Sequence, residues 1–94
     1  SNYTSLIFSS KKEKLVIDFS KKIYDQINEN FKNIEIFGPA PAILYKKNDF
    51  FRYKILIKMN KNLILQKRVK KFFMNIKCPS NLKLYIDVDP INFV

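Results

Sequence analysis

The chain has 94 residues, and its 18 lysine and arginine residues against eight acids give a formal net charge of +10. Cys78 is the single cysteine and there is no histidine, so the composition excludes an internal disulfide and a zinc site built from thiolates and imidazoles. No apolar run approaches the ~20 residues of a membrane-spanning helix, and the first residues lack the charged, apolar and small-residue segments of a signal peptide. We therefore expect one soluble, intracellular, metal-free domain over residues 1–94.

The first third of the chain predicts a strand followed by an amphipathic helix. Residues 3–8 are short, apolar and partly β-branched, which is typical of a strand. Ser10 and Glu13 have the spacing of a capping box, so we expect the helix to begin there. Its apolar positions recur at intervals of three and four: Leu15, Val16, Phe19, Ile23, Ile27 and Phe31. This helix is expected to be structural.

The middle of the chain predicts a hairpin. Residues 34–37 form a second strand, which we expect Gly38 and two prolines to stop, with a short extension at 43–45. Residues 46–49 are the polar turn. In the returning strand, 51–59, side chains on the two faces alternate along the sequence. One face carries Phe51, Tyr53, Ile55, Ile57 and Met59, and the other carries Arg52, Lys54, Leu56 and Lys58.

A second helix and a final strand complete the pattern. Asn60 or Asn62 can cap the helix, and residues 77–80 end it. Its buried stripe is Leu65, Val69, Phe72, Phe73 and Ile76. In the last strand Leu82, Leu84, Ile86 and Val88 face the core, opposite Lys83, Tyr85, Asp87 and Asp89.

This order of elements predicts an α+β fold. The elements follow the order strand, helix, strand, strand, helix, strand, which is typical of the ferredoxin-like, or ribosomal-protein-like, βαββαβ pattern. That fold is a four-stranded antiparallel sheet with two helices on one face. Two strands that alternate between apolar and charged residues indicate that the other face is open to solvent.

The positive charge is concentrated in residues 41–83, where twelve lysine and arginine residues accompany one acid, Asp49, for a net charge of +11. Clustered cations favour a polyanion, because neutralised phosphates release counterions. An ordinary solvated face is the alternative. Within the segment we distinguish a strand-and-hairpin surface suited to phosphates from a helix face suited to an acidic tail. The candidate DNA-binding residues are Lys46, Lys47, Arg52, Lys54, Lys58, Lys67, Arg68 and Lys71.

One flank of the second helix offers a different kind of site. Asn62, Gln66 and Lys70 recur at four-residue spacing, and Leu63 projects beside them. Two amides, an ammonium and exposed apolar groups suit an acidic peptide that ends in a hydrophobe. Scattered surface residues without a role are the alternative.

Catalytic chemistry has no candidate residues here. There is no histidine base, no activated nucleophile and no phosphate-binding glycine loop, since Gly38 stands alone. Asp87 and Asp89 share a face, but two acids beside a basic surface more often pair with cations than bind magnesium. We therefore expect no catalytic residues, no metal site and no cofactor in this chain.

Four phrases of the sequence resemble one family. They are Gly38 to Ala42, Arg52 to Lys58, the pair Leu65-Gln66, and the closing Asp87-Val88-Asp89-Pro90 with Phe93 soon after. In this order and spacing they are similar to the C-terminal domains of primosomal protein N′, the bacterial replication restart helicases. The resemblance covers nearly the whole chain, although the first strand and helix match only in character.

The resemblance implies a piece of a larger cytoplasmic, nucleoid-associated helicase. The parent is an ATP-dependent 3′-to-5′ DNA helicase, whose ATP and zinc sites belong to other domains. The family implies DNA binding at stalled or branched forks, contact with the helicase core, and docking of the acidic, phenylalanine-ended tail of single-stranded-DNA-binding protein. That docking place uses a glutamine, matched by Gln66, and an arginine one turn earlier, where this chain has Asn62.

The leading hypothesis is a non-catalytic, monomeric module that binds branched or single-stranded DNA with little sequence preference and docks partners in primosome assembly. A module that captures only the acidic tail is the second hypothesis. A ribosomal or RNA-binding-like domain is the third, although Phe51 and Tyr53 are expected to face the core and so to offer no stacking platform.

Overall fold

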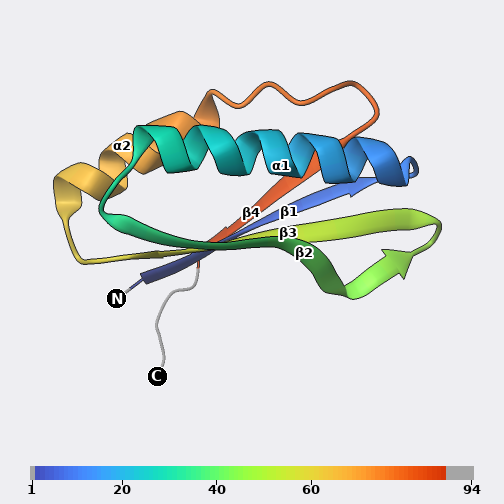
Figure 1. Ribbon diagram of the computed structural model, residues 1–94, viewed down its shortest axis with the longest axis horizontal. Coiled ribbons are helices and arrows are strands. Elements are labelled where there is room, and N and C mark those ends of the chain that lie inside the picture. Colours follow the sequence, from blue (N-terminus) through green and yellow to red (C-terminus); the bar gives the residue numbers. More distant parts are fainter. Residues whose placement is uncertain (1, 89–94) are drawn as a thin grey trace.

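The computed structural model describes residues 2–88, apart from the side chains of Asn2, Ile43, Leu44 and Lys47. Its elements are β1 (Asn2–Ser10), α1 (Glu13–Asn30), β2 (Ile34–Lys47), β3 (Phe50–Met59), α2 (Leu63–Met74) and β4 (Lys83–Val88). The strands form one antiparallel sheet in the order β2-β3-β1-β4, with both helices on one side of it (Figure 1). This arrangement confirms the predicted α+β, ferredoxin-like fold.

The core lies between the sheet and the two helices, and α1 supplies most of its helical side. The predicted stripe of the helix is confirmed, with Val16, Phe19, Ile23, Ile27 and Phe31 buried and Leu15 packed beside them. The two central strands supply the other side through Leu6, Phe8, Ile55 and Ile57, all with no exposed surface. Full burial of such side chains contributes about 1.5–3 kcal/mol each relative to exposure.

The start of α1 differs from the predicted capping box. The helix begins at Glu13, but its N-cap residue is Lys12, which makes no side-chain cap. The hydroxyl of Ser10 accepts a hydrogen bond from the Lys12 N–H at 3.1 Å instead of capping the helix. Ser10 cannot serve as the N-cap because β1 continues through it, paired with Phe51 of β3.

The predicted stop of the second strand at Gly38 is wrong, because β2 continues to Lys47. Its pairing with β3 is nevertheless irregular, with register shifts between Phe37 and Ala40 and again before Lys46. Gly38 has φ +99°, and a Cβ there would lie 2.7 Å from the carbonyl oxygen of Lys54. Glycine therefore lets the strand step across the irregularity without a backbone clash.

The predicted hairpin turn is confirmed and is shorter than expected. β2 ends at Lys47 and β3 begins at Phe50, which leaves two turn residues. Asn48 has φ 52° and Asp49 has φ 67°. Two residues with positive φ match the right-handed twist of the flanking strands, and Asn and Asp tolerate this conformation better than most residues.

α2 is capped as predicted but ends early. The Asn62 side chain caps its first turn, and Leu65, Val69 and Phe73 are buried. The helix ends at Met74, before the predicted stop at 77–80, so Ile76 of the expected stripe lies beyond the helix and is half-buried. At the end, the Asn75 side-chain amide donates to the carbonyl of Lys71 at 2.9 Å.

Candidate functional site

The open face of the sheet gathers cations from several strands. Arg52, Lys54 and Lys58 alternate with the core residues of β3 and lie on this face, as predicted. β1 pairs with β3 on one side and β4 on the other, so Ser9 has Arg52 and Lys83 as its two partners. Lys83, which is 31 residues away from Arg52 in the sequence, thus joins the same row across the sheet.

Lys58 differs from the other two cations of β3. Its ammonium lies 3.8 Å from the Glu35 carboxylate of β2 and 5.8 Å from the centre of the Tyr3 ring. Arg52 and Lys54 have no ion pair within the described residues. Of the three β3 cations, Lys58 is therefore the one whose charge a neighbouring acid offsets in the described structure.

At the hairpin, Lys46 is exposed and its ammonium lies 5.1 Å from the centre of the Phe51 ring, a cation–π arrangement. The side chain of Lys47 lies outside the described residues. Phe51 and Tyr53 pack against the core, as expected, so neither ring is available on the open face.

α2 lies on one side of the sheet (Figure 1) and carries Lys67, Arg68 and Lys71, whereas the β3 cations alternate with its core residues and face the other side. Lys67 and Lys71 are exposed, and the guanidinium of Arg68 lies 5.5 Å from the centre of the Phe31 ring. Six of the predicted DNA-binding residues thus form two sets on opposite sides of the sheet: Arg52, Lys54 and Lys58 on β3, and Lys67, Arg68 and Lys71 on α2. Lys46 belongs to neither set, because it pairs with Phe51 and lies over its ring.

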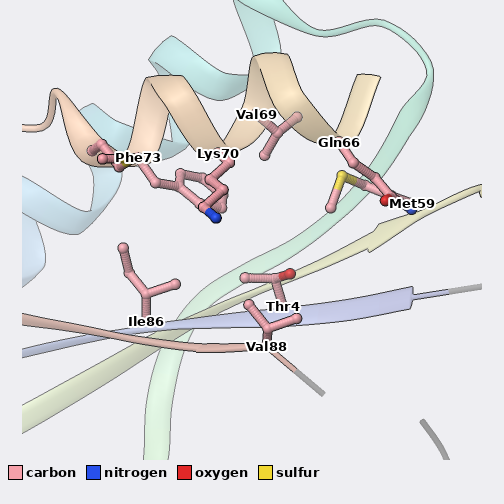
Figure 2. A pocket seen from close by; sticks show the side chains of 9 residues that line it. Thr4, Met59, Gln66, Val69, Lys70, Phe73, Ile86 and Val88 are labelled. Atoms are coloured by element: carbon pink, nitrogen blue, oxygen red, sulfur yellow. The ribbon is translucent and has the colours of Figure 1, made fainter. Parts of the chain in front are cut away.

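A groove runs between α2 and β4 (Figure 2). The helices leave the core-facing side of β4 partly uncovered, so Ile86 and Val88 are 43% and 61% exposed although their positions in the strand predicted burial. The groove has a volume of about 370 Å³. It is lined by Thr4, Met59, Gln66, Val69, Lys70, Phe73, Met74, Ile86 and Val88.

Of the four residues predicted for the acidic tail, the structure brings two together at this groove. Gln66 and Lys70 line it from α2, beside its apolar floor (Figure 2). Asn62 does not line it, and its side-chain oxygen accepts a hydrogen bond from the Leu65 N–H at 3.0 Å. Leu63 is 67% exposed and also lies outside the lining.

Four residues that the sequence analysis did not assign to a site lie around two adjoining hollows at the far end of the open face. One hollow has Arg52, Lys83 and Tyr85 in its lining, and the other has Lys11, Lys12 and Lys83. Alternation placed Lys83 and Tyr85 on the outer face of the last strand. Their neighbours depend on which strands pair, which local patterns do not encode.

Perturbed ionisable groups do not mark a catalytic centre in the described part of the chain. The hydrogen bond and charge of Asp18, 2.6 Å away, raise the pKa of Lys14. Partial desolvation raises the pKa of the Cys78 thiol. Among residues 2–88, no three potential metal ligands cluster; Asp89, the proposed companion of Asp87, lies outside the described residues. Neither described helix is long and apolar enough to cross a membrane.

Comparison with known proteins identifies relatives over nearly the full chain. The family model of the primosomal protein N C-terminal domain matches residues 1–91. The replication restart protein PriA of Rickettsia prowazekii is 39% identical over 93 residues, which cover 99% of this chain and 14% of that protein. The PriA protein of Synechocystis is 36% identical over 65% of this chain, which covers 7% of that protein. The PriA protein of Chlamydia muridarum is 26% identical over 90% of this chain, which covers 11% of that protein. The chain thus spans about one seventh of the Rickettsia relative.

Proposed function

Because this chain belongs to the family of primosomal protein N C-terminal domains, we propose that it is a non-catalytic DNA-binding and partner-docking module of a cytoplasmic replication restart helicase. It acts at stalled or branched forks as one domain of the longer protein. ATP hydrolysis and zinc binding belong to other parts of that protein, whose core this domain contacts.

The observation that carries the proposal is the concentration of unpaired cations on an open sheet face. Arg52 and Lys54 project from the open face of β3 with no acid bound to them in the described structure. They belong to the segment 41–83, whose net charge of +11 also includes the cations of α2 on the other side of the sheet. Like charges on one surface repel one another, and DNA phosphates relieve that repulsion while releasing counterions. Such contacts carry no base recognition, so the binding has little sequence preference.

Fluorescence anisotropy of a labelled fork, titrated with the 94-residue chain at several salt concentrations, tests the proposal. We expect the logarithm of the association constant to fall linearly with the logarithm of the salt concentration. Binding that does not change with salt, or no binding at low salt, would overturn the proposal.

A matched pair of triple variants locates the surface. Neutralising Arg52, Lys54 and Lys58 to Gln should weaken fork binding and flatten its salt dependence. The same change at Lys14, Lys21 and Lys22 of α1 removes three charges from a different face and should have a smaller effect. Circular dichroism checks that both variants remain folded. Equal losses would argue against the sheet face.

The groove supports a second function, capture of an acidic tail that ends in phenylalanine. Its apolar floor suits the terminal ring, while the Lys70 ammonium and Gln66 amide suit the terminal carboxylate. The family resemblance names the tail of single-stranded-DNA-binding protein as this partner. Asn62 stands where the family has an arginine, so Lys70 supplies the positive charge in this chain.

Calorimetry with a synthetic acidic peptide ending in Phe tests the groove. We expect heat of binding for the wild-type chain and its loss with Gln66→Ala or Lys70→Ala. Lys67→Ala is the control, because Lys67 is exposed on α2 but does not line the groove. A peptide without the terminal Phe should bind more weakly; equal heats for both peptides would exclude the groove as its site.

A further inference from the structure

Ser9 lies between two cations on the open face of the sheet. Its partner on β3 is Arg52 and its partner on β4 is Lys83. Neighbouring strands lie ~4.8 Å apart, so the two cationic residues stand on either side of Ser9 with their backbones roughly 10 Å apart. Both side chains line a hollow of about 390 Å³ that also includes Ser9. A guanidinium and an ammonium therefore line one small space, with the nearly buried Ser9 between them.

The charge around this hollow has one sign. A second hollow of about 360 Å³ shares Ser9, Phe50 and Lys83 with the first and adds Lys11 and Lys12. Within this second hollow the Lys11 ammonium lies 5.5 Å from the centre of the Phe50 ring, a cation–π contact. Neither lining contains an acid, and the two ion pairs of the described residues lie elsewhere. Four cations thus lie around this end of the sheet, and no acid is among the residues that line the two hollows.

An exposed aromatic ring borders the cations. Tyr85 lies on the same face of β4 as Lys83, lines the first hollow and is 52% exposed. Its partner on β1 is Ile7, which pairs on its other side with Lys54. Phe51 and Tyr53 of β3 point to the core. Phe50, the first residue of β3, lines the hollow together with Tyr85, and Tyr85 is the ring that lies beside the cations on β4.

We infer that the hollow above Ser9 binds one nucleotide unit of single-stranded DNA, with its phosphate between Arg52 and Lys83 and its base stacked on Tyr85. This inference rests on the proposed DNA-binding function and deepens it, because it names the strand state that the open face selects. A base inside a duplex has both faces covered by its neighbours, whereas an unpaired base can stack on a protein ring.

Substitutions at Tyr85 separate stacking from charge. Tyr85→Ala should weaken binding of a labelled oligo-dT roughly 5- to 150-fold, the range of losses for removing one stacked base, while Tyr85→Phe, which keeps the ring, should bind like wild type. A duplex of the same length should bind Tyr85→Ala and wild type equally. Phe37→Ala is the control, because Phe37 is a similarly exposed aromatic (49%) on the edge strand β2 and lies outside both hollows.

The phosphate contact of Arg52 and Lys83 is tested by the salt dependence of single-strand binding. Arg52→Gln combined with Lys83→Gln should lower the salt slope for the single strand by about 0.7, the value for one phosphate contact. Neutralising Lys21 and Lys22, two exposed lysines of α1 on the helical side of the sheet, removes the same charge and should leave the single-strand slope unchanged. An equal fall in both double variants would overturn the phosphate assignment.

The outcomes distinguish the inference from the function on which it rests. Salt-dependent DNA binding that Tyr85→Ala leaves unchanged, or reduces equally for duplex and single strand, would overturn the inference and leave the proposed function intact. No salt-dependent binding to any DNA would overturn both. A crosslinking measurement on the wild-type chain is independent of variant folding. Irradiation with an oligonucleotide containing 5-iododeoxyuridine should give an adduct on the peptide that carries Tyr85, and adducts confined to other peptides would contradict the assignment.

Discussion

The side-chain oxygen of Asn62 and the backbone N–H of Leu65 form a 3.0 Å hydrogen bond at the start of α2. Such a bond satisfies one of the backbone donors that the first turn of a helix leaves unpaired. Asn62 therefore has a structural role in this chain, although the corresponding position of the resembled family is an arginine associated with tail binding. The stability of α2 and the chemistry of the groove can thus be tested separately.

Asn62→Ala should lower the free energy of unfolding by about 1 kcal/mol, because the cap is lost. Urea denaturation followed by circular dichroism measures this change. Asn60→Ala, two residues earlier, is the control and should have little effect. An unchanged midpoint for Asn62→Ala would mean that the cap contributes nothing to stability.

Ile57→Ala removes a fully buried side chain from the centre of the sheet and should cost about 2–5 kcal/mol, combining lost burial with the cavity left behind. Leu63→Ala, at a site that is 67% exposed, should change stability by less than about 0.5 kcal/mol. Both values come from the same denaturation experiment. Similar losses for the two variants would show that the assigned core is wrong.

Gly38→Ala should destabilise the chain by more than about 1 kcal/mol, because a side chain at φ +99° is strained and its Cβ would approach the Lys54 carbonyl oxygen. Asn48→Gly provides the opposite comparison. Asn48 also has positive φ, at 52°, and glycine adopts that conformation freely. Thermal unfolding of both should show a clear fall in Tm for the first variant alone; a Gly38→Ala protein as stable as wild type would contradict this account of β2.

Lys54 and Lys58 should contribute unequally to DNA binding. Lys54→Gln should reduce the salt slope for a duplex by about 0.9, the value for one phosphate contact. Lys58→Gln should reduce it less, because Glu35 lies 3.8 Å from the Lys58 ammonium and offsets its charge. Anisotropy titrations at four salt concentrations measure both slopes. A larger effect for Lys58 would show that this ion pair does not persist when DNA binds.

Cys78 should react slowly with iodoacetamide near neutral pH. Partial desolvation raises the pKa of its thiol in the folded chain, and the thiolate is the reactive form. At pH 8 the folded chain should therefore be alkylated more slowly than the chain unfolded in urea, and the two rates should approach each other as the pH rises above the folded-state pKa. Mass spectrometry follows the single adduct. Equal rates at pH 8 would exclude the raised pKa.

Much of this architecture could be predicted because the relevant signals are local. The spacing of Val16, Phe19 and Ile23 indicates which side of α1 is buried, since a helix repeats every 3.6 residues. The two-residue alternation of β3 likewise indicates which side carries Arg52 and Lys54. The errors also have local causes: a capping-box spacing suggested Ser10 as the N-cap, and Gly38 followed by prolines suggested a stop in β2. Strand pairing overrode both signals.

The candidate sites were predicted less completely, because they depend on contacts between distant segments. The groove exists because α2 does not cover Ile86 and Val88 of β4, and no periodicity in either element predicts how far one lies from the other. Gln66 and Lys70 were predicted from helical spacing, whereas Met59 and Thr4 come from strands that only the fold brings near them.

By itself the sequence determined the order of the elements, the buried side of each helix, the excess of charge in residues 41–83 and the family. The first three follow from composition and from repeats of two and 3.6 residues, which act over one element at a time. The family follows from the resemblance of the four phrases between Gly38 and Pro90. Only the tertiary structure decided that Arg52, Lys83 and Tyr85 share one hollow. That arrangement follows from the order β2-β3-β1-β4, in which β1 lies between strands whose residues 52 and 83 are far apart along the chain.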